Sequence, residues 1–72
     1  MFIVVQKGDA VKNTLYMESI YEDGGYICYK NTEGGGRVLG YYPDRDKALD
    51  VLNRLLDAMA RKLNVFRMPE GS

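Results

Sequence analysis

The chain has 72 residues, with ten basic and ten acidic side chains, one cysteine and no histidine. A single cysteine cannot form an internal disulfide, and without histidine the chain cannot assemble the usual zinc sites of cysteine and histidine ligands. The balanced charge also argues against a binder of duplex DNA, which normally carries a basic footprint, so we expect no nucleic-acid partner.

A chain of this length forms one domain with a marginal core, because folding buries only about 60% of the surface that the unfolded chain exposes. Small domains usually gain stability from disulfides, a metal or a second subunit. Since the composition argues against the first two, we expect a homo-oligomer. No apolar stretch reaches the roughly 20 residues that span a bilayer, and the N-terminus lacks the pattern of a signal peptide. We therefore expect a cytoplasmic protein without membrane contact.

The first part of the chain predicts extended structure. Phe2–Gln6 is a short β-branched run that ends at a turn over residues 7–9. Val11–Asp23 is a second extended stretch, whose imperfect alternation requires a bulge or a break near Asn13 and Thr14. The glycines that follow Asp23 supply positive-φ residues between two tyrosine-bearing runs, which is a strong hairpin signal.

The second part predicts two more strands and a helix. Tyr26–Asn31 is the third strand and Arg37–Tyr42 is the fourth. From residue 46 to residue 63 the apolar side chains recur at spacings of three and four, which is the pattern of an amphipathic helix. Asp44 is a good N-cap for this helix, and we expect Asn64 to end it in the left-handed conformation.

The short apolar run Val65–Met68 follows the helix and is long enough to add an edge strand before Pro69. The predicted fold is therefore α+β, an antiparallel sheet of four strands packed on one amphipathic C-terminal helix, or of five strands if this last run joins the sheet. Residues 1–69 form a single domain, and residues 70–72 are expected to be a frayed C-terminal tail.

Three consecutive glycines precede Arg37 and look at first like a phosphate-binding loop. Such loops need a defined pattern, and they lead into a helix whose N-terminus faces the anion. Here the glycines lead into a predicted strand, so the simplest interpretation is a hairpin turn. A second interpretation stays open, in which the three unhindered amides of Gly34, Gly35 and Gly36 beside Arg37 close over an anion.

The tyrosines of the third and fourth strands form the other candidate site. Tyr26 and Lys30 share one face of the third strand, and Arg37 and Tyr41 share one face of the fourth. If the two faces coincide, they form a patch suited to a nucleotide, with a base stacked on tyrosine and phosphates bound by the cations. Ordinary cross-strand pairs are the alternative. The predicted ligand-binding residues are Tyr26, Lys30, Gly35, Gly36, Arg37, Tyr41 and Tyr42.

Support for catalysis is weak in this chain. Cys28 lies inside a predicted strand with no imidazole in the sequence, which favours a small buried side chain over a nucleophile. Asp44 and Asp46 resemble a pair of metal ligands, but the first turn of a helix favours negative charge for its own reasons. We therefore expect no enzymatic activity, no catalytic residues, no metal and no cofactor.

Several short segments stand out along nearly the whole chain: the apolar start ending in Gln6, Asn13, residues 17–20, residues 39–42, Ala48, residues 51–52 and residues 66–69. Together these segments resemble a family of small proteins that are encoded on prophages, phages and integrative elements of Firmicutes. The resemblance mostly marks core and turn positions, and the three glycines lie outside it.

The phage setting that this resemblance implies favours proteins that act by binding. Such proteins inhibit bacterial defence systems by blocking an effector or by sequestering its nucleotide signal in an oligomer. The leading hypothesis is therefore a non-enzymatic, homo-oligomeric anti-defence protein in the host cell cytoplasm that sequesters an anionic, cyclic nucleotide between subunits. The alternative is an inhibitor or adaptor that binds a host defence protein directly and takes no small-molecule ligand.

Overall fold

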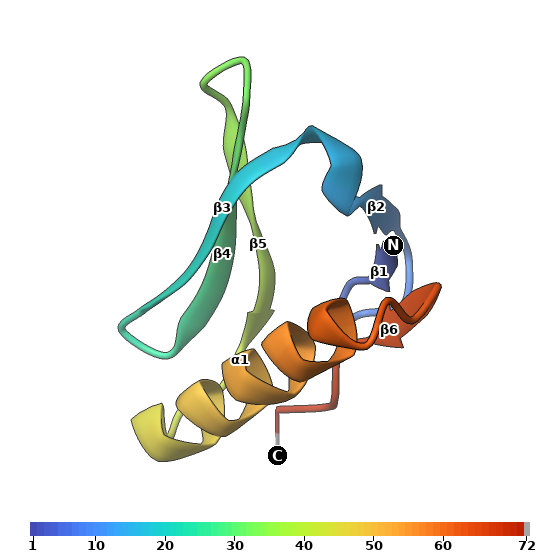
Figure 1. The fold of residues 1–72 in the computed structure, drawn as a ribbon. Helices are drawn as coiled ribbons and strands as arrows, with labels where there is room; N and C mark the ends of the chain where they lie inside the picture. The colour runs from blue at the N-terminus through green and yellow to red at the C-terminus, as the bar shows by residue number, and fades with distance from the viewer. Residues whose placement is uncertain (72) are drawn as a thin grey trace.

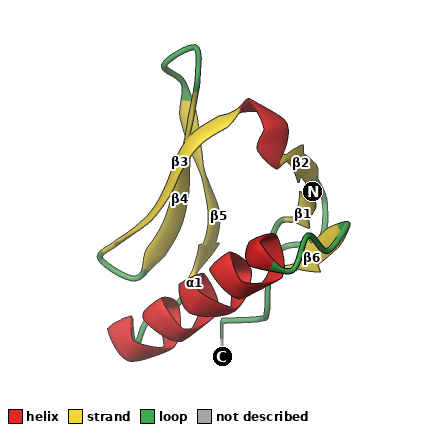
Figure 2. Ribbon diagram, viewed as in Figure 1, coloured by secondary structure: helices red, strands yellow, loops and turns green. Residues whose placement is uncertain are grey.

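The computed structural model describes residues 1–71, and Ser72, which the sequence assigned to a frayed tail, lies outside the described residues. Within this range the chain forms six strands, one 3-10 turn and one α-helix (Figures 1 and 2). These elements are β1 (Phe2–Val4), β2 (Val11–Asn13), η1 (Thr14–Tyr16), β3 (Met17–Asp23), β4 (Tyr26–Asn31), β5 (Gly36–Tyr41), α1 (Arg45–Ala60) and β6 (Val65–Arg67).

The strands of residues 1–71 form two three-stranded sheets, whereas the sequence predicted one sheet of four or five strands. One sheet has the order β3-β4-β5 and is antiparallel. The other has the order β2-β1-β6, in which β1 pairs antiparallel with β2 and parallel with β6. The α+β class is confirmed, and the arrangement of its strands as a single sheet is wrong.

The two sheets separate at η1, between β2 and β3. Asn13 caps this turn by accepting a hydrogen bond on Oδ1 from the backbone N–H of Leu15 at 3.0 Å. Thr14 fixes its direction, because its N–H and its hydroxyl both donate to the carbonyl of Met1, at 2.9 and 3.1 Å. The predicted break near Asn13 and Thr14 is confirmed. It sends one half of the extended stretch into each sheet, which is why the single-sheet prediction failed.

The last strand, β6, forms where the sequence predicted it but joins β1 in a parallel pair, with Ile3 opposite Phe66. The two sheets meet just beyond β1, where the N–H of Gln6 donates to the carbonyl of Leu39 at 2.9 Å. The side-chain amide of Gln6 also bridges Tyr41, since Nε2 donates to the Tyr41 carbonyl at 2.9 Å and Oε1 accepts from the Tyr41 N–H at 2.8 Å. Gln6 therefore ties the end of β1 to β5.

The turn between β3 and β4 lies at Gly24 and Gly25, as predicted, and both glycines have positive φ, 58° and 91°. The N–H of Gly25 donates to Glu22 Oε2 at 2.8 Å, and Glu22 also forms an ion pair with Arg45 at 3.4 Å. Because Arg45 is the first residue of α1, this carboxylate fixes the hairpin turn to the start of the helix.

Asp44 caps α1 as predicted, accepting a hydrogen bond on Oδ1 from the N–H of Asp46 at 2.9 Å. The helix ends at Ala60, before the predicted end at residue 63. Lys62, and not Asn64, takes the left-handed conformation, with φ of 58°. The N–H groups of Lys62 and Leu63 then bond back to the carbonyls of residues 59 and 58, which closes the helix end as a Schellman motif.

One core lies between α1 and the two sheets. The helix runs across the open side of the molecule in Figure 1 and covers the inner faces of the strands. No helix among residues 1–71 is long and apolar enough to cross a membrane. The buried residues of the core are Ile3, Ile27, Tyr29, Leu39, Tyr42, Ala48, Val51, Leu55 and Met68.

Candidate functional site

The predicted ligand residues lie on the β4-β5 hairpin, and its register brings two of the tyrosines together. Tyr26 lies opposite Tyr41, with ring centroids 4.5 Å apart and ring planes tilted by 43°. Both side chains are exposed, whereas Ile27, next to Tyr26, is buried in the core. The pair therefore lies on the outer face of the β3-β4-β5 sheet, which α1 does not cover.

A β-bulge separates the two predicted cations. Strand β5 has one extra residue at Leu39, which shifts its alternation by one. Lys30 lies opposite Gly36, whereas Arg37 lies opposite the buried Tyr29. Directly opposed residues share a face of the sheet, so Lys30 and Arg37 point to different faces. The predicted patch that united both cations with the tyrosines is therefore not formed.

Tyr42 lies in the core and not in the predicted site. Its side chain is fully buried, and its hydroxyl donates to the carbonyl of Pro69 at 2.7 Å. Burial raises the pKa of Tyr42 to about 12, because the apolar core disfavours the phenolate. The alternation of β5 explains the difference, since Tyr41 points outward and the next residue must then point inward.

The glycine loop is the turn of the β4-β5 hairpin, as its simplest interpretation predicted. The carbonyl of Gly35 accepts from the N–H of Asn31, and Gly34 has a φ of 97°. A Cβ on Gly36 would lie 2.5 Å from the carbonyl oxygen of Tyr29. The close approach of β4 therefore requires glycine at position 36, and no ligand is needed to explain it. Arg37 bends back onto this turn, with Nη1 donating to the Gly36 carbonyl at 3.0 Å.

A concavity of about 300 Å³ lies beside the tyrosine pair, and we call it the tyrosine pocket. Its lining is mostly apolar, and it combines residues from the β4-β5 hairpin with residues that follow β1. No sequence pattern indicated the second group, because these residues reach the tyrosines only where the two sheets meet. The lining residues are Val5, Gln6, Lys7, Tyr26, Val38, Leu39, Gly40 and Tyr41.

Lys7 supplies the charge of the tyrosine pocket. Its side chain is exposed, and within residues 1–71 it has no ion-pair partner. Gln6, the other polar residue of the lining, uses both atoms of its amide on the backbone of Tyr41. The pocket therefore offers one available cation beside two aromatic rings.

The thiol of Cys28 shares the outer face with the tyrosine pair, because it lies two residues from Tyr26 along β4. Burial raises its pKa, and the carboxylates of Asp23 and Glu22 add to the rise. A raised pKa disfavours the thiolate, which is the reactive form. In the described part of the chain no three His, Cys, Asp or Glu side chains form a group that could hold a metal ion.

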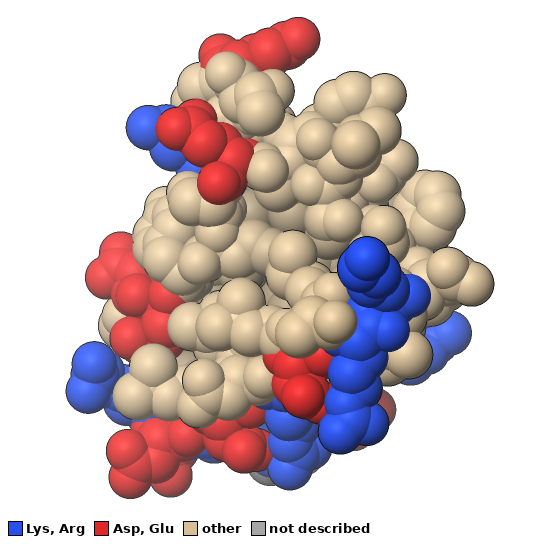
Figure 3. Space-filling model, in the orientation of Figure 1, with Lys and Arg blue, Asp and Glu red and all other residues tan. Residues whose placement is uncertain are grey.

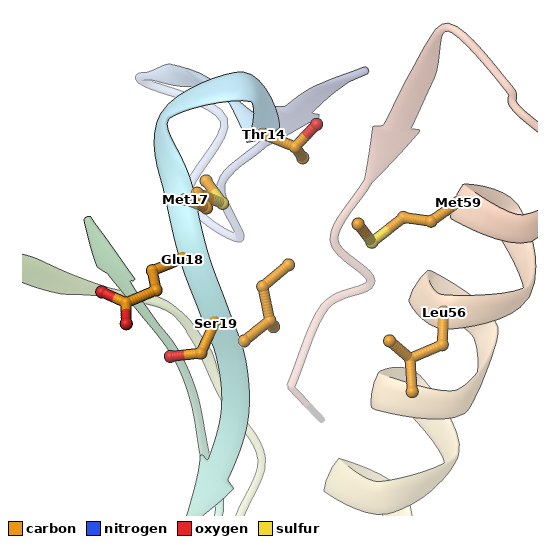
Figure 4. Close-up of a pocket in the computed structure, with 7 residues that line it drawn as sticks. Thr14, Met17, Glu18, Ser19, Leu56 and Met59 are labelled. Atoms are coloured by element: carbon orange, nitrogen blue, oxygen red, sulfur yellow. The ribbon is translucent and has the colours of Figure 1, made fainter. Parts of the chain in front are cut away.

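A second concavity lies between β3 and α1, where Leu56 and Met59 point across toward the strand while Glu18 points away from the hollow (Figure 4). Its volume is about 130 Å³, and an adjoining hollow of about 270 Å³ shares Thr14 and Met59 with it. We call the two together the β3-α1 groove. It is lined by Met1, Thr14, Met17, Glu18, Ser19, Ile20, Leu56, Met59, Lys62, Leu63 and Asn64.

The charged side chains do not spread evenly over the molecule. In the orientation of Figure 3 a broad uncharged surface occupies the centre and upper right, and most charges gather along the lower edge and the left side. Many large apolar side chains are exposed, among them Leu15, Leu56 and Leu63. Contiguous exposed apolar surface marks sites of interaction.

Comparison with known proteins gives no matching family model, and neither curated proteins nor solved structures yield a match.

Proposed function

We propose that the protein is a non-enzymatic binding protein that captures a small anionic ligand with a planar ring, such as a nucleotide signal, at the tyrosine pocket. The exposed Tyr26 and Tyr41 ring pair beside Lys7 carries this proposal. A base stacks on an exposed aromatic ring, and a lysine ammonium binds a phosphate. In a phage protein, such capture would withhold a defence signal from its effector.

The contacts that the tyrosine pocket can offer determine the expected affinity for a nucleotide. Stacking of one base contributes roughly 1–3 kcal/mol, and one charge-assisted hydrogen bond contributes roughly 1.5–3 kcal/mol. Their sum corresponds to dissociation constants from tens of micromolar to above one millimolar. A titration that tests the proposal must therefore extend to millimolar ligand.

The experiment is a calorimetric titration of the protein with cyclic nucleotides, linear nucleotides and ADP-ribose. We expect at least one of them to bind, and Tyr41→Ala to weaken that binding about tenfold through the loss of stacking. Lys7→Ala should weaken the nucleotide but not the uncharged nucleoside. Tyr21→Ala is the matched control, because Tyr21 is also exposed on the sheet but does not line the pocket. The proposal fails if no ligand binds or if Tyr41→Ala binds as the wild type does.

A second candidate function is direct binding to a host protein, and η1 favours it. Leu15 and Tyr16 are 74% and 62% exposed, and they lie side by side on a turn that Asn13 caps. Tyrosine is frequent among the residues that dominate binding energy at protein interfaces. This candidate predicts a host partner that is lost in Leu15→Ser combined with Tyr16→Ser and kept in Tyr41→Ala. Nucleotide capture predicts the opposite dependence.

A further inference from the structure

We infer that the tyrosine pocket is one half of a site for two bases joined through phosphate. The second base lies over Cys28 and against Tyr21, on the outer face of the β3-β4-β5 sheet. The inference rests on the proposed nucleotide capture, because the first base is the one that stacks on Tyr26 and Tyr41. A dinucleotide and the end of a single-stranded nucleic acid share this chemistry.

The outer face of the sheet continues from the tyrosine pocket to Tyr21. Val38 lines the pocket and lies opposite Cys28, which in turn lies opposite Tyr21. Directly opposed residues share a face, and neighbouring strands lie about 4.8 Å apart. Tyr21 and Val38 are 46% and 49% exposed. The two side chains therefore flank Cys28 on one surface, which α1 does not cover.

The tyrosines of this face form two separate stacking positions. Tyr26 and Tyr41 contact each other, with ring centroids 4.5 Å apart, and form the first position. Tyr21 lies diagonally across from Tyr26, a relation that places side chains about 7–8 Å apart in an antiparallel pair. Aromatic rings on a sheet each stack one base of an unpaired strand, and stacking tolerates any base. The spacing therefore suits two neighbouring bases of one ligand.

Cys28 leaves space for the second base. Its half-buried thiol has four neighbours on the outer face, all with larger side chains: Tyr21, Val38, Tyr26 and Lys30. The tyrosine pocket, at about 300 Å³, is at the lower limit for a small-molecule site, so we assign it to one base with its sugar. A second base then lies beyond Val38, over the small side chain.

Two lysines flank the aromatic face. Lys7 lines the tyrosine pocket, and Lys30 lies two residues beyond Cys28 on β4. Both are exposed, and within residues 1–71 neither forms an ion pair. Cations on both sides of stacking rings complement a ligand whose bases are joined through phosphates. An apolar peptide would use neither charge, so the charges favour a nucleotide as the occupant.

One carboxylate on this face opposes the ligand. Asp23 lies opposite Tyr26, is exposed and forms no ion pair within residues 1–71. Its negative charge repels a phosphate beside the tyrosine pair. Asp23→Asn should therefore lower the dissociation constant about twofold to threefold, the scale of one exposed charge contact. A gain in affinity is a result that misfolding could not produce.

The first experiment compares ligands with one base and two bases by calorimetric titration. The linear dinucleotide pApA should bind about tenfold more tightly than AMP, because a second base is stacked. Tyr21→Ala should remove this gain and leave AMP binding unchanged, whereas Tyr41→Ala should weaken both ligands. Circular dichroism and a thermal melt establish that each variant is folded. An oligoadenylate distinguishes the two sources, since only a strand site binds it more tightly than pApA.

The second experiment uses Cys28, the one cysteine of the chain, as a reporter of the second position. Alkylation by iodoacetamide, followed by mass spectrometry, should slow about tenfold at saturating pApA and less than about twofold at saturating AMP, because reaction requires access to the thiol.

The inference is overturned if pApA binds no more tightly than AMP, if Tyr21→Ala keeps the preference for pApA, or if pApA leaves the alkylation rate unchanged. In each of these cases binding of AMP at the tyrosine pocket still supports the proposed function. Binding of no nucleotide at all would overturn the proposed function together with the second position, so the two failures are distinguishable.

Discussion

The two sheets of this small protein differ in how far apart along the chain their paired strands lie. The β3-β4-β5 sheet joins neighbours in sequence through two short turns, so each strand finds its partner locally. The β2-β1-β6 sheet has strands of three residues, and its parallel pair joins Phe2 near one end of the chain to Val65 near the other. Pairs that distant cost more chain entropy to form. The second sheet therefore depends on the core, and on contacts with the first sheet, for its stability.

The tyrosine pocket lies at the junction of the two sheets. Its aromatic rings come from β4 and β5, and its lysine follows β1. Gln6 and Tyr42 make the ties across this junction, Gln6 through the backbone of Tyr41 and Tyr42 through the carbonyl of Pro69. Substitutions at Gln6 or Tyr42 should weaken the contact between the two sheets. Substitutions in the β3-β4 turn should first destabilise the β3-β4-β5 sheet.

The largest effect is expected from Gly25→Ala in the β3-β4 turn. Gly25 has a φ of 91°, and a Cβ there would lie 2.4 Å from the carbonyl oxygen of Tyr42. Left-handed strain of about 1–2 kcal/mol and an overpacking cost of about 1–3 kcal/mol add to a loss of about 2–5 kcal/mol in the free energy of unfolding. Urea denaturation measures this loss.

Gly24→Ala is the matched control for this variant. Gly24 also has positive φ, 58°, but open space surrounds the position of its Cβ. We expect it to lose only the strain, about 1–2 kcal/mol. Equal losses in the free energy of unfolding for the two variants would show that the close approach of the Tyr42 carbonyl to Gly25 does not contribute to stability. That approach would then not link the hairpin to the start of the helix.

Features set by short-range chemistry could be predicted from the sequence. The turn at Gly24 and Gly25, the break after Asn13 and the cap at Asp44 each depend on residues within four positions of one another. The opposite directions of Tyr41 and Tyr42 were also readable, because adjacent residues of a strand point to opposite faces. Both tyrosines were nevertheless among the predicted ligand-binding residues, although this alternation places only one of them on the outer face.

Features set by distant contacts could not be predicted. The parallel pairing of β1 with β6 leaves no local pattern, and it places β6 beside β1 instead of at an edge of the β3-β4-β5 sheet. The bulge at Leu39 moves Arg37 to the other face from Lys30, yet the sequence there reads as a regular strand. Lys7 lines the tyrosine pocket next to Gln6, whose side-chain amide bonds to the backbone of Tyr41 in β5, a contact between residues 35 positions apart. The contact between Tyr26 and Tyr41 could therefore be anticipated from the sequence, whereas the position of Lys7 beside them could not.

The next effect concerns Tyr42 at high pH. Burial raises its pKa from 10.0 to about 12, so the unfolded chain ionises first and gains stability relative to the folded one. The contribution is fully present below pH 10 and is lost as the pH rises from 10 to 12. Two pKa units correspond to about 2.7 kcal/mol. The free energy of unfolding at pH 9 and pH 12 measures the fall.

Tyr42→Phe separates this loss from other alkaline effects. The variant lacks the hydroxyl that donates to Pro69, so it starts about 0.5–1.5 kcal/mol less stable at pH 9. Between pH 9 and pH 12 its stability should then fall less than that of the wild type. An equal fall in the free energy of unfolding for the two proteins would show that the core does not keep Tyr42 neutral. The contact of Tyr42 with Pro69 would then be weaker than its hydrogen bond of 2.7 Å implies.

The smallest loss in the free energy of unfolding is expected from Gln6→Leu. This variant is also the most direct test of the contact between the two sheets. The substitution keeps the bulk of the side chain but removes both hydrogen bonds to Tyr41. These groups are exposed, so water replaces part of the loss, and the free energy of unfolding should fall by about 1–2 kcal/mol. Gln6→Glu should lose less, because its carboxylate still accepts from the Tyr41 N–H while only the donor is lost.

Amide hydrogen exchange then shows where the lost stability lay. Because Gln6 ties β1 to β5, protection should decrease for amides of β1 and β6 and stay unchanged in the β3-β4 hairpin, which opens separately. A uniform decrease would mean that the two sheets open as one unit and that local and distant pairing do not differ in stability. In the first case Gln6→Leu should also weaken ligand binding, since Lys7 is then no longer held beside the tyrosine rings. The exchange pattern thus decides whether the tyrosine pocket is preformed by the fold or depends on this one amide.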